Sequence, residues 1–251
     1  MLGRLEIFFK KIVKNNILLF IFANYLIYKY KITTSAHYEL LNLIKKKSPY
    51  IIDIGGNAGE SIKKFLKIKP FAKIKSFEPN IQSYKKLCEN FKDQKNVKIN
   101  NCALGFTNLK RKIGWGGDQN KSIFYIYTPY IYNFKFWSWS SIRLGDLKKN
   151  LKFHCPSIYK NFNFIKKRIL LKNLDDFNLK SDLIKIDVEG FELEVISSGI
   201  QTLRKNYILL IEINKNKNKI KKKLNELGYE MLETRGKYDN NYCFINKKNI
   251  C

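Results

Sequence analysis

The sequence predicts an α/β fold with a doubly wound, mainly parallel, Rossmann-like sheet that carries one antiparallel strand. Three observations lead to this prediction. An apolar run at residues 51–54 stops at a glycine cluster and is followed by a helical pattern. Short apolar runs then alternate with helical patterns, which is typical of a parallel sheet covered by helices on both faces. Residues 228–232 and 241–245 form a final pair of strands.

The composition is typical of one globular domain in a reducing compartment. The chain has 251 residues, 45% of them hydrophobic, which is enough for one large core. Its five cysteines form no C-x-x-C pair, which argues against a disulfide scaffold or a zinc ribbon and favours the cytoplasm. The net charge of +27 accompanies abundant Lys, Asn and Ile, as AT-rich codons produce. We therefore assign most of this charge to coding bias and do not expect a nucleic-acid partner.

Residues 1–48 are expected to be an N-terminal helical segment ahead of the main domain, residues 49–251. The apolar run of residues 17–28 is broken by Asn24 and is too short to span a bilayer comfortably. It lacks a small-residue cleavage site, so no signal peptide is expected. Two interpretations remain open for residues 1–31. One is a helix that covers the sheet or a partner in a homodimer, and the other is a basic segment peripheral to the inner face of the membrane.

A helix over residues 33–48 leads into the first strand, residues 50–54, and its glycine loop. The loop sequence Asp53-Ile-Gly-Gly-Asn-Ala-Gly59 has a G-G-x-x-G spacing, unlike the G-x-G-x-x-G of dinucleotide sites. Its glycines let a ligand approach the main chain, and the next helix directs free N–H groups and its positive dipole end at that ligand. The expected cofactor contacts are Asp53, Gly55, Gly56, Asn57 and Gly59.

The second strand, residues 73–77, is followed by an acid and a proline. Glu78 lies 25 positions after Asp53, which resembles the rule that a carboxylate at the end of strand two binds a ribose diol. The alternative is that Glu78 caps the helix that starts near Ile81. We favour ribose binding at Glu78 and Pro79, because ligands of open α/β sheets bind at the carboxyl edge of the strands.

The third strand is expected over residues 97–103, after a helix over residues 81–91. Its end, Asn100 to Cys102, lies where an adenine edge needs a donor and an acceptor, and an Asn amide offers both. Asn101 and Cys102 are therefore candidate cofactor contacts. Alternatively, these Asn residues only shape a turn.

An aromatic insertion, residues 113–165, interrupts the alternation. It is dense in Tyr, Phe and Trp, whose faces stack on sugars and apolar rings, so we expect a lid or an acceptor region. The alternatives are a local aromatic core or a subunit interface. His154 lies in this part, and a lone loop histidine is more often structural than catalytic.

Carboxylates gather at the ends of the fourth and fifth strands. Asp187 ends the fourth strand, Glu189 follows two residues later, and Glu212 ends the fifth. Helices over residues 191–198 and 217–227 follow these strands. Because parallel strands end at one edge of a sheet, we expect the three acids to meet the glycine loop there, as at a functional site.

The fourth strand and the helix after it resemble the signature of the FkbM family of S-adenosylmethionine-dependent methyltransferases. The matching stretch is Leu183-Ile-Lys-Ile-Asp-Val-Glu-Gly-Phe-Glu-Leu-Glu-Val-Ile196, followed by Gly199. The motifs in the same order are Asp53-Ile-Gly-Gly-Asn-Ala-Gly59, Phe77-Glu-Pro79, Cys102-Ala-Leu-Gly105, Leu174-Asp-Asp176, Ile211-Glu212 and Gly228-Tyr229. Gly56 stands where alanine is more usual, a difference expected to be without consequence.

The resemblance implies a class I methyltransferase fold, S-adenosylmethionine as cofactor, and O-methylation of a hydroxyl on a sugar, a glycan or a natural product. The protein must then align the acceptor oxygen and remove its proton, and Asp187 and Glu189 are the candidate catalytic residues. Lys185 shares a strand face with Asp187 and is expected to pair with a buried acid. In a minority alternative, which we do not favour, Asp187, Glu189 and Glu212 hold a divalent cation.

Two other functions fit parts of the sequence. The positive charge suggests an RNA methyltransferase, but the chain lacks an Asn/Asp-Pro-Pro-Tyr motif and a Cys nucleophile motif. A non-catalytic, membrane-associated scaffold would keep the fold, but the intact glycine and acid motifs count against it. The expected partner is a small-molecule or glycan acceptor.

Overall fold

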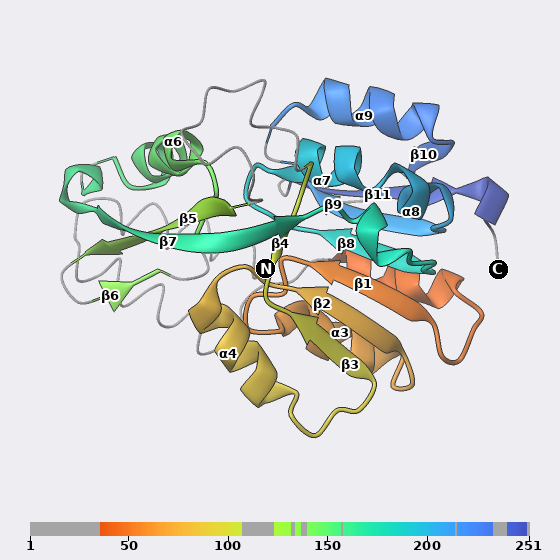
Figure 1. The fold of residues 1–251 in the computed structure, drawn as a ribbon. Helices are drawn as coiled ribbons and strands as arrows, with labels where there is room; N and C mark the ends of the chain where they lie inside the picture. The colour runs from red at the N-terminus through yellow and green to blue at the C-terminus, as the bar shows by residue number, and fades with distance from the viewer. Residues whose placement is uncertain are drawn as a thin grey trace.

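The order of strands in the central sheet decides where each functional residue lies. The structure, a computed structural model, describes residues 36–106, 123–131, 134–136, 140–156, 158–213, 215–232 and 240–249. Seven strands form one sheet in the order β10-β11-β9-β8-β1-β2-β3 (Figure 1). They are β10 (Tyr229–Leu232), β11 (Asn241–Asn246), β9 (Ile208–Glu212), β8 (Leu183–Ile186), β1 (Tyr50–Ile54), β2 (Lys73–Phe77) and β3 (Val97–Asn100).

The direction of the strands confirms the predicted fold class. The pairs β1–β2, β1–β8, β2–β3 and β8–β9 are parallel, whereas β11 is antiparallel to both β9 and β10. The chain therefore winds outward from β1 in one direction to β3, and returns through β8 to build the other half. The point between β1 and β8, where the order reverses, is where open α/β sheets bind ligands.

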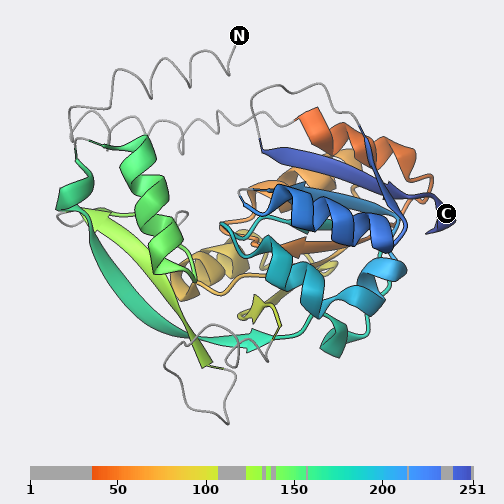
Figure 2. The same ribbon diagram turned by 90° about the horizontal axis from the view of Figure 1, so that it is seen from above.

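Helices cover both faces of this sheet because its strands are apolar on both sides. Within β1, Ile51 packs with the helices of one face, and Ile52 packs with those of the other. Figures 1 and 2 show the two layers. The first layer contains η2 (Ala36–Leu43), α3 (Glu60–Ile68) and α4 (Ile81–Asn90), and the second contains α7 (Glu192–Ser198), α8 (Ile200–Arg204) and α9 (Lys217–Glu226).

The described part of the insertion forms a second sheet with its own core. This sheet has the order β4-β7-β5-β6, with β4 (Ala103–Leu104), β7 (Asn163–Lys172), β5 (Ile123–Ile131) and β6 (Phe134–Lys135). Helix α6 (Leu144–His154) and η5 (Tyr159–Asn161) pack on it, and Phe136 and Phe162 meet in the core with ring centroids 5.5 Å apart. The short elements η6 (Asp175–Phe177) and η7 (Lys247–Asn249) complete the fold.

Two predicted elements differ from the structure. The strand expected over residues 97–103 is two strands, because the chain leaves the central sheet after Asn100 and Ala103 pairs with Leu171 of β7 instead. The helix expected over residues 33–48 is the 3-10 helix η2. Residues 1–31, and with them both interpretations of the N-terminal segment, lie outside the described ranges.

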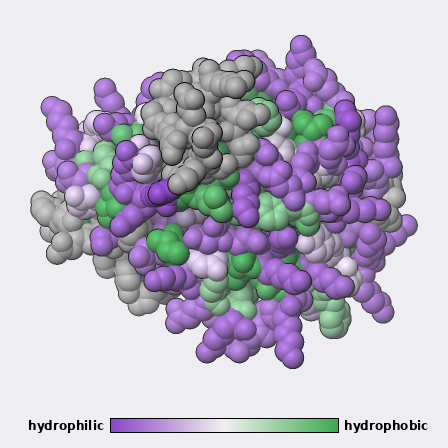
Figure 3. Space-filling model, viewed as in Figure 1, coloured by the Kyte–Doolittle hydropathy of each residue, from purple (hydrophilic) through white to green (hydrophobic). Residues whose placement is uncertain are grey.

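The face seen in Figure 1 is covered mainly by hydrophilic side chains (Figure 3). Within the ranges that the structure describes, no helix is long and apolar enough to cross a membrane.

Gly56 has a local reason to be glycine, contrary to the expectation that alanine would be equivalent. An added Cβ would lie 2.2 Å from Ser76 Oγ and 3.2 Å from Asp53 Oδ2. The Ser76 hydroxyl occupies this space because it donates a hydrogen bond to Asp53 over 3.1 Å. The glycine and the serine are therefore complementary.

We predict that Gly56→Ala destabilises the fold by about 1–3 kcal/mol, because it overpacks a filled site. Ser76→Ala alone should cost about 1–2 kcal/mol for the lost hydrogen bond to a carboxylate. The double variant should be more stable than the sum of the two changes by about 1 kcal/mol, since the shortest contact of the Cβ disappears with the hydroxyl and the 3.0 Å approach to Leu87 remains. Urea unfolding of the four proteins measures this, and strictly additive changes would show that the Cβ does not meet Ser76.

Candidate active site

A cavity lies at the carboxyl edge of the central sheet, at the point where the strand order reverses. Its volume is about 290 Å³, close to the lower end of the ~300–1,000 Å³ usual for small-molecule sites. The residues that follow or end β2, β1, β8 and β9 line it from one side, and the insertion lines it from the other. The lining residues are Ile54, Gly55, Asn57, Phe77, Glu78, Pro79, Ser83, Cys102, Ala103, Leu104, Ile126, Ser140, Ile142, Asp187, Val188, Glu189, Phe191 and Glu212.

Glu78 faces this cavity although its side chain is almost fully buried. One carboxylate oxygen accepts the N–H of Asn57 at 2.8 Å, and the other accepts the N–H of Asn80 at 2.7 Å. Burial raises the pKa of Glu78 to about 7, against the lowering effect of these two N–H groups. The cap of α4 is Asn80, whose side-chain oxygen accepts from Gln82 and Ser83. Glu78 therefore holds the glycine loop in place and keeps lone pairs for a ligand.

The glycine loop brings main chain and carboxylates close together. Gly55 has a φ of 88°, and a Cβ there would lie 1.8 Å from the carbonyl oxygen of Asp187. Asn57 also has a positive φ of 46°, and its side-chain oxygen accepts the Ser83 hydroxyl at 3.1 Å. The other predicted contacts of this loop, Asp53, Gly56 and Gly59, are not among the residues that line the cavity.

Of the two predicted adenine contacts, Cys102 lines the cavity and Asn101 does not. Cys102 lines the cavity beside Pro79. The amide of Asn101 donates to the main-chain oxygens of Glu78 and Pro79, at 2.8 and 3.3 Å. Asn101 thus joins the ends of two strands, which agrees with the alternative that these Asn residues shape a turn.

A line of polar side chains crosses the buried α3 face of the sheet and ends in the cavity. Asp53 is fully buried and accepts hydrogen bonds from Ser61 and Ser76. The Lys185 ammonium lies 3.8 Å from Asp53 Oδ1 and 3.0 Å from Asp187 Oδ2. Burial lowers the pKa of Lys185, but the two carboxylates outweigh it, so this pKa lies above its ordinary value. The expected pairing of Lys185 with a buried acid is confirmed.

The acids around Asp187 hold protons more tightly than usual. The Asp187 carboxylate, followed by burial and Glu189, raises the pKa of Glu212 to about 9, and the two side chains share a hydrogen bond. Burial, followed by Asp187, raises the pKa of Glu189 to about 8. Glu189 also has a φ of 52°, a strained conformation that non-glycine residues keep mainly at functional sites. Glu189 and Glu212 therefore keep a proton to higher pH than an exposed glutamate does, because each is buried beside Asp187.

The structure adds site residues that the sequence did not indicate. Ile126, Ser140 and Ile142 of the insertion line the cavity. The Asn80 amide donates to Thr128 and Ser140, at 3.1 and 2.9 Å, and so ties the insertion to the start of α4. No local pattern in the sequence indicates these contacts, because the partners of Asn80 lie 48 and 60 positions away.

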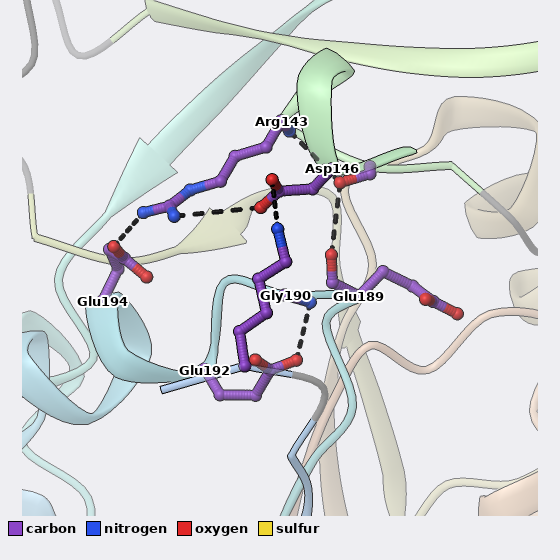
Figure 4. Close-up of polar contacts among 8 residues, drawn as sticks. Arg143, Asp146, Glu189, Gly190, Glu192 and Glu194 are labelled. Carbon is purple, nitrogen blue, oxygen red and sulfur yellow. Dashed lines mark hydrogen bonds and ion pairs between the residues drawn. The ribbon is translucent and has the colours of Figure 1, made fainter. Parts of the chain in front are cut away.

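A second polar group joins the insertion to the opposite side of the cavity. Arg143 pairs with Glu194 of α7 and lies 3.9 Å from Asp146, which also pairs with Lys215. Figure 4 shows Arg143 between these two acids, while the Glu189 carboxylate points away from them. The Ser141 hydroxyl donates to the Glu189 main-chain oxygen at 3.2 Å. The insertion is thus held on both sides of the site.

The carboxylates are not arranged as a metal centre in the part of the chain that the structure describes. No group of three or more His, Cys, Asp or Glu side chains there could hold a metal ion. The Lys185 ammonium lies 3.0 Å from Asp187 Oδ2. The arrangement suits proton transfer at Asp187.

Comparisons with known proteins agree with this geometry. Residues 53–236 match the family described as the methyltransferase FkbM domain. The 2-O-methyltransferase NoeI of Sinorhizobium fredii is 28% identical over 178 residues, which are 70% of this chain and 68% of NoeI. The crystal structure of methyltransferase FkbM from Methylobacillus flagellatus superposes with a TM-score of 0.50 and 13% identity. The match covers 83% of this chain and 47% of that one, so this chain spans about half its length.

We predict that Glu212 makes the stability of the fold depend on pH. Its pKa is about 9 in the folded chain, against an ordinary value of 4.5, so between these values the folded state binds a proton that the unfolded state has released. Stability is therefore highest in the acidic part of this range and falls as pH rises through it. Glu212→Gln keeps a donor toward Asp187 without a titrating proton. Between about pH 6 and about pH 9, the Glu212→Gln variant should lose about 1–2 kcal/mol less stability than the wild type loses.

Urea unfolding at several pH values measures the difference. Glu226→Gln is the matched control, because Glu226 is exposed on α9. A pH profile of Glu212→Gln that coincides with those of the wild type and the control would contradict the assignment.

Proposed function

The chain belongs to the FkbM methyltransferase family, and we propose that it transfers a methyl group from S-adenosylmethionine to a hydroxyl oxygen of a sugar, a glycan or a natural product. Family membership establishes a methyl-transferring enzyme. The observation that supports the finer proposal is one cavity that joins the glycine loop, Glu78 and the Asp187–Glu212 pair.

The residues of the cavity fit S-adenosylmethionine. Glu78 has both oxygens fixed by main-chain N–H groups, with lone pairs left to accept two ribose hydroxyls. Gly55 and Asn57 give main-chain access, while Phe77, Leu104 and Ile142 supply apolar walls. When bound, this cofactor supplies an electrophilic methyl group on a positively charged sulfur. The Asp187 carboxylate, which lines this cavity, suits that charge.

The residues of the chain have to orient the acceptor and receive its proton. Asp187 is the group that we assign to receive the acceptor proton, because its side chain is 34% exposed and reaches the cavity. Lys185 fixes its position from below through the 3.0 Å contact. Glu212 and Glu189, with raised pKa values, are assigned to orient the acceptor through hydrogen bonds.

Two comparisons bear on the alternatives. The name of NoeI specifies methylation at an oxygen, which supports an O-methylating role here. Membership of an enzyme family argues against a scaffold without activity. A cytoplasmic location, a peripheral membrane contact through residues 1–31 and a homodimer stay predictions.

We predict that Glu78→Gln weakens binding of S-adenosylmethionine by about 2–4 kcal/mol, because charge-assisted hydrogen bonds to the ribose are lost. Calorimetry measures this, with Glu89→Gln as a control that removes one exposed charge from α4. Equal affinities of the two variants would remove Glu78 from the cofactor site.

We predict that Asp187→Asn lowers kcat by roughly 10²–10⁴ while cofactor affinity stays near that of the wild type. The assay follows transfer of a radiolabelled methyl group to carbohydrate and natural-product extracts. Asp93→Asn, at an exposed position, is the control. Treatment of the wild type with a chelator should leave the rate unchanged. Full activity of Asp187→Asn would exclude a base at this position, and loss of activity with the chelator would favour the cation alternative.

A further inference from the structure

Ser141 is a buried side chain of the insertion that has no part in the chemistry proposed above. Its exposed fraction is 4%, and it is not among the residues that line the cavity. Its hydroxyl donates to the main-chain oxygen of Glu189 at 3.2 Å. We propose that Ser141 is a positioning residue, which holds the turn at Glu189 so that the Glu189 side chain can orient the acceptor. This inference rests on the proposed function, because it concerns the acceptor of that reaction.

The peptide group between Glu189 and Gly190 is held at both of its polar ends. Its carbonyl oxygen accepts the Ser141 hydroxyl, and its N–H donates to Glu192 Oε1 at 2.7 Å. Figure 4 shows a contact on each side of this peptide, one at Glu189 and one between Gly190 and Glu192. Glu192 belongs to the same turn, whereas Ser141 lies 48 positions earlier, in the insertion. The orientation of this peptide therefore depends on the place of the insertion.

The conformation of the turn is one that its surroundings have to impose. Glu189 and Gly190 both have a positive φ, of 52° and 95°. Among the described residues beyond its chain neighbours, a Cβ added at Gly190 would meet only Asp146 Oδ2, at 3.6 Å. The glycine therefore serves the backbone conformation rather than a lack of space there. Because a left-handed glutamate is strained, contacts such as the two hydrogen bonds of this peptide are needed to keep it.

Ser141 is itself fixed by the elements around it. Its main chain forms a bridge with Tyr127 of β5, in which each N–H donates to the oxygen of the other residue, at 2.9 and 3.0 Å. The Arg143 N–H donates to the Ser141 hydroxyl oxygen at 3.1 Å, and the Arg143 side chain pairs with Glu194 of α7. The hydroxyl oxygen thus accepts one hydrogen bond while its proton is directed at Glu189.

These contacts decide where the Glu189 carboxylate lies. With Ser141 in place, Glu189 keeps its left-handed conformation, and its side chain lines the cavity two residues after Asp187. A turn that opens lets Glu189 return to an unstrained φ, and its side chain then leaves this place. The orientation of the acceptor by Glu189 thus depends on a hydroxyl group of the insertion.

The test observes this one peptide group by NMR, in the full chain loaded with S-adenosylhomocysteine. Glu189-Gly190 is the only Glu-Gly pair in the sequence, so labelling with ¹³C-carbonyl glutamate and ¹⁵N-glycine gives one carbonyl–nitrogen correlation. Ser141→Ala removes the hydroxyl. Ser197→Ala is the matched control, because the Ser197 hydroxyl donates to the main-chain oxygen of Leu193 at 2.7 Å and Ser197 does not line the cavity.

In Ser141→Ala the Glu189 carbonyl resonance should move, and the Gly190 N–H should exchange with solvent about three- to tenfold faster, as expected when one hydrogen bond no longer resists local opening. In the methyl-transfer assay this variant should need about three- to tenfold more carbohydrate extract for half its maximal rate, because Glu189 orients the acceptor less well. Its affinity for S-adenosylhomocysteine, measured by calorimetry, should equal that of the wild type. Ser197→Ala should match the wild type in all four measurements.

Three results would overturn the inference while leaving the proposed function in place. They are an unchanged resonance and exchange rate in Ser141→Ala, the same changes in Ser197→Ala, and a changed resonance with an unchanged requirement for extract. A wild type that binds no S-adenosylhomocysteine, or transfers no methyl group to any extract, would instead overturn the proposed function and the inference with it.

Discussion

One ammonium group between two carboxylates fixes the geometry on which the site depends. Lys185 reaches Asp53 on one side and Asp187 on the other, and both Lys185 and Asp53 are buried in the sheet. A buried charge is costly unless it is paired. Displacing either carboxylate would therefore leave the buried Lys185 ammonium with one partner fewer. The register of β1 and β8 places Asp53 directly beside Lys185. Strand register and charge pairing thus specify the same arrangement.

The contacts of Lys185 also position the residues that line the cavity. Because Lys185 holds Asp187 from below, the carboxylate faces the cavity and acts on Glu212 at the end of the next strand. The same region contains Gly55, whose missing side chain lets the glycine loop lie against the Asp187 main chain. The glycine loop and the acid that we assign to proton transfer are therefore set by contacts between two neighbouring strands.

The central sheet could be predicted from the sequence, but the walls of the site could not. Apolar strands, the glycine loop and the alternation of Lys185 with Asp187 are local patterns, and each fixes an element or a shared face. The second sheet depends on pairing between β5 and β7 across distant residues, such as Tyr125 with Arg168, which no local period reveals. For the same reason the end of β3 at Asn100, and the contribution of Ser140 and Ile142 to the cavity, became visible only in the structure.

The separate core of the insertion has a consequence for how such enzymes diversify. Phe136, Leu147 and Phe162 pack with one another, apart from the two cores that flank the central sheet. Ile126 and Ile142, which line the cavity, pack instead in the small cluster between the insertion and Phe191. Mutations can therefore accumulate inside the insertion without disturbing Lys185 and its partners. Substitutions in the insertion can therefore reshape the wall of the pocket while the central sheet beneath it keeps its own packing.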